Sequence, residues 1–183
     1  PLVLFVALNG ITDCNKGWDL LEAALHAAVT RVPALECVIV GAEMLASFRQ
    51  PRFPIHWFGR VYDERLLPVI YGAADVVAVP SRRENLPQAA TEAQACGRPV
   101  VAFATSGLND VVLDGVTGHL VRPYLSEELG GAISSLLTDR AKASAFSLAA
   151  TQRARELWSP PAVMPAILRI YDQVLRRHAG GPS

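Results

Sequence analysis

The chain has 183 residues, and 51% of them are hydrophobic, which is typical of a single globular domain and excludes a chain that is disordered as a whole. Its 17 basic and 17 acidic residues cancel, so the net charge gives no reason to expect nucleic-acid binding. The three cysteines form no Cys-x-x-Cys pair, which argues against a disulfide framework or a zinc site and favours a reducing cytoplasm.

The apolar stretches are short and interrupted, so we expect no membrane span, and the N-terminus lacks the basic region of a signal peptide. Because the chain does not begin with Met, we expect it to be a piece of a longer protein.

Short apolar runs alternate with helical patterns along the chain. Continuous apolar runs, typical of strands buried on both faces of a parallel sheet, predict strands at residues 2–8, 36–41, 55–58, 75–80, 99–103 and 119–121. Helical spacing of apolar residues predicts helices at residues 20–28, 63–73 and 126–179, the last of them broken near 158–161. The alternation predicts an α/β fold: a Rossmann-like parallel sheet of about six strands in the order 3-2-1-4-5-6, with helices on both faces.

We expect one domain over residues 1–179, with residues 161–178 as its terminal helix and residues 180–183 as a frayed tail. In the helix that begins at Ser126, Gly130 and Gly131 are expected to weaken the helix early.

The most informative segment runs from Ser81 to Val101. It begins at the carboxyl end of a predicted strand, where open α/β sheets bind ligands, and it opens a helix whose first N–H groups favour an anion. Pro87 suits the first helical position, because its missing N–H would be unpaired there. Two carboxylates, Glu84 and Glu92, accompany this anion site, and the hydroxyl groups of a sugar or ribose are natural donors to them.

Glu84, seven residues, Glu92 and then Ala-Gln-Ala-Cys-Gly-Arg-Pro-Val-Val resemble the E-x7-E signature of the group 1, family 4 retaining glycosyltransferases. The resemblance extends from about Leu4 to about Leu175. It implies the C-terminal, donor-binding half of a GT-B fold, with the N-terminal acceptor domain absent from this chain. It also implies that the terminal helix, residues 161–178, is a crossover helix that returns towards that N-terminal domain. The stretch Glu-Asn-Leu-Pro-Gln at 84–88 is similar to a subgroup associated with cell-surface polysaccharide and colanic-acid-type synthesis.

The resemblance implies roles for the residues at matching positions. Glu84 would orient the donor sugar and stabilise its developing charge, Glu92 would bind the ribose hydroxyls, and Lys16 would hold the diphosphate leaving group. Further donor contacts are implied at Gly10, at Arg60 and Val61, where the family holds the base, and at the backbone of Asn85, Leu86 and Gln88. The family pattern R-x4-K-G has its Lys and Gly here, but Ile11 stands where its Arg is expected.

Some of these positions also have simpler explanations. Gly10 could be a tight-turn glycine without a ligand, and Arg60 could form a surface ion pair with Asp63 or Glu64. The loop at residues 105–107 is similar to the family's loop after the fifth strand and could offer further amides to the ligand, but it also fits an ordinary helix cap.

The resemblance implies that the parent enzyme transfers a sugar from a nucleoside diphosphate sugar to a glycan or lipid-linked sugar held by the missing N-terminal domain. The chain contains neither D-x-D nor G-x-G-x-x-G, so we expect no metal and no nicotinamide cofactor. The parent is expected in the cytoplasm, and a peripheral position at the inner membrane face is also open. A nucleotide-sugar epimerase half and a non-catalytic nucleotide-binding module stay open as alternatives, and this chain alone is expected to be inactive.

Overall fold

The computed structural model describes residues 1–179, with side chains described through residue 176. Its centre is one all-parallel sheet, which confirms the predicted α/β architecture and the predicted strand order β3-β2-β1-β4-β5-β6. The strands are β1 (Leu2–Val6), β2 (Glu36–Val40), β3 (Ile55–Trp57), β4 (Val76–Val79), β5 (Val100–Phe103) and β6 (Gly118–Val121). The tail expected at residues 180–183 lies outside the described residues.

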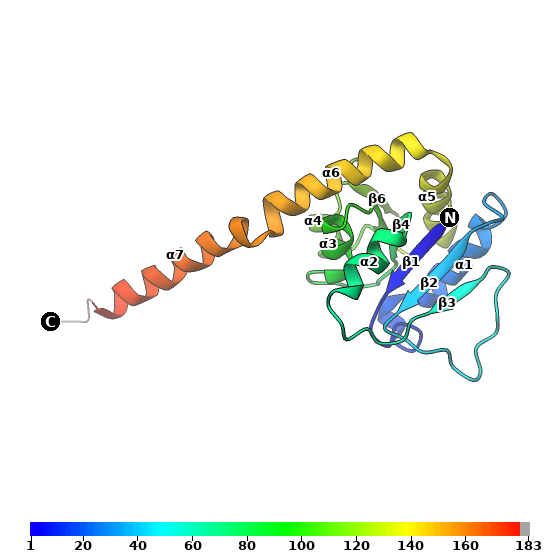
Figure 1. The fold of residues 1–183 in the computed structure, drawn as a ribbon, viewed down its shortest axis with the longest axis horizontal. Coiled ribbons are helices and arrows are strands. Elements are labelled where there is room, and N and C mark those ends of the chain that lie inside the picture. The colour runs from blue at the N-terminus through cyan, green and yellow to red at the C-terminus, as the bar shows by residue number, and fades with distance from the viewer. Residues whose placement is uncertain (180–183) are drawn as a thin grey trace.

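Helices cover both faces of the sheet (Figure 1). They are the short 3-10 helix η1 (Cys14–Lys16), α1 (Trp18–Ala28), α2 (Leu66–Ala73), α3 (Gln88–Ala95), α4 (Leu108–Val111), α5 (Ser126–Thr138), α6 (Arg140–Trp158) and α7 (Pro160–Ala179). Strand residues alternate between two apolar cores: Val3 and Phe5 pack with α1 and α5, whereas Leu4 packs with α2, α3 and α4. The period-two alternation of side chains along a strand produces these two layers.

Helix α2 begins later than the sequence predicts. Its first residue is Leu66 and not Asp63, because the Asp63 carboxylate accepts the backbone N–H of Arg65 at 3.0 Å and holds a turn ahead of the helix. Short side chains such as Asp compete in this way with helical hydrogen bonding.

Helix α5 runs without a break through Gly130 and Gly131, although both glycines were expected to weaken it. Gly130 lies against the backbone of α1: a Cβ atom added there would be 2.4 Å from the carbonyl oxygen of Ala24. The missing side chain therefore allows α1 and α5 to pack closely over the sheet.

We expect Gly130→Ala to lower the free energy of unfolding by about 1–3 kcal/mol, because the added methyl group must push two packed helices apart. Gly131→Ala is the matched control in the same helix, since its Cβ would meet only the end of the Arg31 side chain, at 3.6 Å. That substitution should stabilise the chain by up to ~1 kcal/mol through helix propensity. Urea unfolding of both variants measures the difference, and equal effects would contradict the packing explanation.

Helix α6 ends at Trp158, and Ser159 separates it from α7, close to the predicted break. Helix α7 leaves the body of the domain, and its apolar side chains, including Ile167, Ile170 and Leu175, are exposed (Figure 1). Among residues 1–179, no helix is both long and apolar enough to cross a membrane.

Candidate functional site

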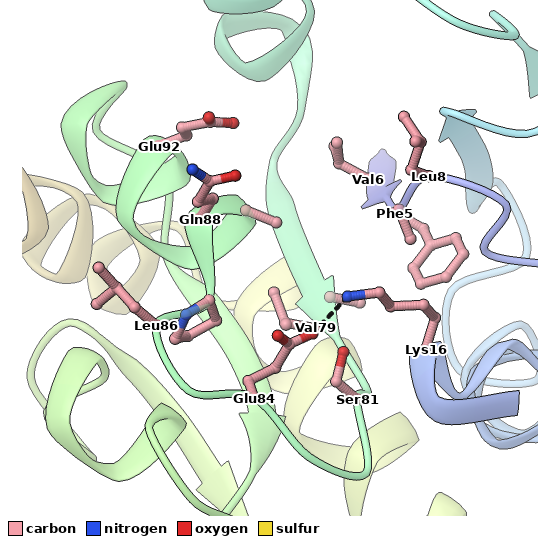
Figure 2. A pocket seen from close by; sticks show the side chains of 14 residues that line it. Phe5, Val6, Leu8, Lys16, Val79, Ser81, Glu84, Leu86, Gln88 and Glu92 are labelled. Atoms are coloured by element: carbon pink, nitrogen blue, oxygen red, sulfur yellow. Dashed lines mark hydrogen bonds and ion pairs between the residues drawn. The ribbon is translucent and has the colours of Figure 1, made fainter. Parts of the chain in front are cut away.

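The loops that follow β1 and β4 meet at the carboxyl edge of the sheet, because parallel strands all end at the same edge. Between them is a pocket of about 440 Å³, a volume in the range of small-molecule sites. Its charged lining residues are Lys16, Glu84 and Glu92 (Figure 2). The predicted contact residues Leu86 and Gln88 line the same pocket.

Lys16 and Glu84, the two residues predicted to be catalytic, contact each other directly. The Nζ atom of Lys16 donates a hydrogen bond to Oε1 of Glu84 at 2.8 Å, and the two side chains are 27% and 16% exposed. Lys16 ends η1, and Gly17 follows it in the left-handed region with φ 72°, which favours glycine. A Cβ atom at Gly17 would lie 2.1 Å from the carbonyl oxygen of Pro80, so this glycine also lets the Lys16 loop approach the end of β4.

The N-terminus of α3 opens into the same pocket. Pro87 is the cap residue and not the first helical residue, so α3 begins one position later than predicted, at Gln88. Gln88 and Ala89 line the pocket, and helix geometry leaves their N–H groups without an intrahelical carbonyl partner. This end of the helix, together with the Lys16 ammonium group, favours an anionic ligand.

Glu92 stands on α3 beyond Gln88, at the opposite end of the pocket from Glu84 (Figure 2). Its Oε2 atom accepts a hydrogen bond of 2.8 Å from the hydroxyl group of Tyr71, which belongs to α2 and is 1% exposed. The sequence did not point to Tyr71, because no motif links it to Glu92, which lies 21 positions later in the chain. The contact uses only one of the two carboxylate oxygens of Glu92, and a carboxylate can accept further hydrogen bonds from a ligand in the pocket that it lines.

The pKa of Tyr71 is raised above its usual value of about 10. The larger cause is burial of its ring, and the second is the negative charge of the nearby Glu92 carboxylate. Above about pH 10 this tyrosine loses its proton in the unfolded chain while it keeps it in the folded chain. We therefore expect the free energy of unfolding to fall as the pH rises above about 10. In Tyr71→Phe the alkaline loss should be smaller, and at neutral pH the lost hydrogen bond should cost about 1 kcal/mol. Chemical unfolding at pH 7 and 10.5 tests both expectations. Tyr62→Phe, whose ring is 85% exposed, is the control and should match the wild type.

The loop after β5 supports Glu84 from behind. The Gly107 N–H donates to the backbone carbonyl of Glu84 at 2.9 Å, and Thr105 donates from its hydroxyl to the carbonyl of Ser81 at 3.4 Å. A Cβ atom at Gly107 would lie 1.7 Å from the carbonyl oxygen of Asn85. The Gly107 amide is therefore used inside the protein, and this loop braces the Glu84 loop rather than offering that amide to a ligand.

Other predicted residues lie outside this pocket. Arg60 lines a second pocket of about 340 Å³ together with Ile11. Its guanidinium group donates to the side-chain oxygen of Asn9 at 3.3 Å, so Arg60 pairs with neither of the two acids suggested for it.

Three more predicted residues have structural surroundings of their own. Val61 packs against the apolar core under α2 and α3. Gly10 is buried, and a Cβ atom there would be 2.7 Å from Ala7, which explains the glycine by packing alone. Asn85 is exposed and lines neither pocket. Their donor contacts stay predictions.

The loop after β1 adds no second cation to the Lys16 pocket. Leu8, which is 61% exposed, lines that pocket, whereas Ile11 faces the second one. Ile11, at the position where the family's Arg is expected, is therefore apolar and does not line the Lys16 pocket. In the part of the chain that the structure describes, no three His, Cys, Asp or Glu side chains are arranged to hold a metal ion.

The parallel sheet and the pocket at its carboxyl edge define a Rossmann-like α/β domain. A model of the family described as "Glycosyl transferases group 1" matches residues 1–139. The chain therefore belongs to the group 1 glycosyl transferases.

Two relatives share the name D-inositol 3-phosphate glycosyltransferase. The protein from Xylanimonas cellulosilytica is 43% identical over 97% of this chain and 43% of its own length. The protein from Mycobacteroides abscessus is 48% identical over 86% of this chain and 37% of its own length. The chain thus spans less than half of either relative. These names give no support to the expected kinship with colanic-acid-type enzymes.

Solved structures share the fold. Sucrose-phosphate synthase from Thermosynechococcus elongatus has a TM-score of 0.81 at 28% identity, covering 97% of this chain and 46% of its own. Anabaena HepE in complex with UDP-glucose has a TM-score of 0.79 at 22% identity, covering 94% of this chain and 48% of its own. The C-terminal domain of the group 1 protein LpcC from Francisella tularensis has a TM-score of 0.74 at 18% identity, covering 86% of both chains.

Proposed function

We propose that this chain is the donor-binding domain of a retaining glycosyltransferase that uses a nucleoside diphosphate sugar. The observation that carries the proposal is that Lys16, Glu84 and Glu92 line the same pocket. In it Lys16 faces Glu84, and Glu92 lies further along α3. The diphosphate would lie at Lys16 and the first turn of α3, the sugar at Glu84, and the ribose hydroxyls at Glu92. UDP is the proposed nucleotide, since HepE and the pneumococcal GtfA have been solved with UDP or UDP-glucose.

The difficult step of such a transfer is the departure of the diphosphate from a sugar that develops positive charge. Lys16 and the α3 amides would stabilise the charge that accumulates on the leaving group, in a pocket where they are already in position. Glu84 would orient the sugar and balance its developing charge. The diphosphate oxygens would replace Glu84 as the partner of Lys16, which frees the carboxylate for the sugar.

For the whole protein we propose D-inositol 3-phosphate, rather than a polysaccharide, as the acceptor. The names of the two relatives support this choice. The acceptor would be held by a domain outside this chain, so we expect this chain alone to bind the donor without transferring sugar.

The full-length protein should be incubated with UDP-sugars and with either D-inositol 3-phosphate or a glycan acceptor. The proposal predicts a glycosylated inositol phosphate whose anomeric configuration, read by NMR, matches that of the donor. Release of an epimerised free sugar would favour an epimerase instead.

A non-catalytic nucleotide-binding module is the second candidate. The observation that favours it is the apolar Leu8 in the pocket, which leaves two carboxylates and one cation among the lining side chains. Donor binding without any transfer by the full-length protein, with every acceptor tried, would support that candidate over an enzyme.

A further inference from the structure

The segment from η1 to the start of α1 and the loop after β4 are far apart in the sequence, and they are joined by side chains that the proposed chemistry does not use. The guanidinium group of Arg82 makes two hydrogen bonds to the carboxylate of Asp19, at 2.7 and 3.0 Å, and also donates to the backbone carbonyl of Cys14. The backbone N–H of Arg82 donates to the carbonyl of Asn15 at 2.8 Å. In return, the side-chain amide of Asn15 donates to the carbonyl of Arg83 at 2.9 Å.

We call this set, Asn15, Asp19 and Arg82, the loop clasp. Each side of the clasp is directly beside a residue of the pocket: Asn15 precedes Lys16, and Arg83, whose carbonyl Asn15 binds, precedes Glu84. Backbone-to-backbone and side-chain-to-backbone bonds of this kind fix the main chain on both sides. They therefore fix the backbone positions of the neighbouring Lys16 and Glu84, from which the two side chains extend into the pocket.

We propose that Arg82 and Asn15 are positioning residues, which hold the Lys16 ammonium group and the Glu84 carboxylate at a fixed separation in the pocket. The proposal rests on the proposed function only for its consequence, donor binding. Its structural part concerns the Lys16–Glu84 pair itself.

The loop clasp lies at the surface of the domain and is not part of its apolar cores. Asp19 is 62% exposed and Arg82 is 31% exposed, and neither belongs to the two apolar cores. Paired Arg–carboxylate bonds are directional, and a lysine cannot reproduce both of them. The hydrogen bond from Arg82, and less strongly its charge, lower the pKa of Asp19, which fits a carboxylate that stays ionised in the clasp. Loss of Arg82 should loosen the two loops and leave the fold intact.

The chain contains only two lysines, Lys16 and Lys142, so the ammonium group of Lys16 can be followed directly. Lys142 donates to the hydroxyl of Ser135 at 3.0 Å in another part of the domain and is the internal reference. The whole 183-residue chain should be labelled with ¹⁵N-lysine, and the Nζ signals and the rate of acylation of each lysine should be measured.

In Arg82→Ala we expect the Lys16 Nζ signal to shift toward that of Glu84→Gln, in which the pair is removed directly. Acylation of Lys16 should rise about tenfold, as expected for loss of one charge-assisted hydrogen bond, with Lys142 unchanged. Arg82→Lys should restore the Lys16 signal in part. Arg65→Ala breaks another paired Arg–Asp contact, which is exposed and lies outside the pocket, and it should leave both lysines as in the wild type.

UDP affinity, measured on the same variants, should fall in Arg82→Ala and recover partly in Arg82→Lys. An unchanged Lys16 signal and reactivity in folded Arg82→Ala would overturn the clasp, whatever the result with UDP. Failure of the wild-type chain to bind UDP would instead count against the proposed donor site, while the lysine measurements still decide the clasp.

Discussion

Gly107→Ala is expected to weaken donor binding and to lower the free energy of unfolding by about 1–3 kcal/mol, the usual cost of overpacking. The added methyl group would lie 1.7 Å from the carbonyl oxygen of Asn85. Because this oxygen belongs to the backbone, it cannot rotate away as the end of a side chain could. The loop that carries Glu84 and leads into α3 must therefore move, and its hydrogen bond with the Gly107 N–H must lengthen or break. The α3 amides assigned to the diphosphate would move with it, which is why UDP binding should weaken. In the full-length enzyme, displacement of the Glu84 carboxylate by about 1 Å should in addition cost about 10²-fold in turnover.

Gly72→Ala is the matched control for this substitution. Gly72 lies in α2, and a Cβ atom there would meet nothing within 4 Å. That variant should be neutral or more stable by up to ~1 kcal/mol, with unchanged UDP binding. Titration with UDP and urea unfolding are the measurements. Normal UDP binding by Gly107→Ala would show that the Glu84 loop does not need this brace.

Glu84→Ala in the full-length enzyme is expected to reduce turnover by about 10²–10³-fold while changing nucleotide affinity little. The carboxylate is assigned to the sugar, so its loss removes an interaction made with the reacting centre and not with the nucleotide. Lys16→Ala should behave differently, because the ammonium group is assigned to the diphosphate in both the bound donor and the transition state. We expect that variant to lose both affinity and turnover.

The split between kcat and the dissociation constant of UDP separates the two roles. Lys142→Ala removes the other lysine of the chain, lies outside the pocket lining and should leave both quantities unchanged. Unchanged turnover in Glu84→Ala would remove Glu84 from the mechanism. An effect of Lys16→Ala on turnover alone would contradict its assignment to the bound diphosphate.

The sheet could be predicted from the sequence because its strands are buried on both faces and are therefore continuous apolar runs, as in Val76–Val79. Strand order followed from the alternation of strands and helices, which restricts parallel sheets to a few topologies. The start of α2 was harder to predict, because a side-chain hydrogen bond competes there with helical hydrogen bonding. Asp63 accepts the N–H of Arg65 in a turn, and α2 begins three residues after Asp63.

Within the site, the motif predicted Glu84 and Glu92, and the structure brings Lys16 into the same pocket. The supports of these residues could not be predicted. Tyr71 contacts Glu92 from another helix, and Arg82 donates to the carbonyl of Cys14 in η1, 68 residues earlier. Such contacts depend on which loops the fold brings together, and no spacing in the sequence encodes them.

The central claim, that the Lys16 pocket is a nucleotide-sugar donor site, is tested most directly by calorimetric titration of this chain with UDP, GDP and ADP. The wild-type chain should bind UDP saturably and with one site. In Lys16→Ala and Glu92→Ala the affinity should fall about tenfold or more, as expected when a charged hydrogen-bonding partner is lost. Binding of equal strength in the wild type and both variants, or no binding of any of the three nucleotides, would contradict the claim.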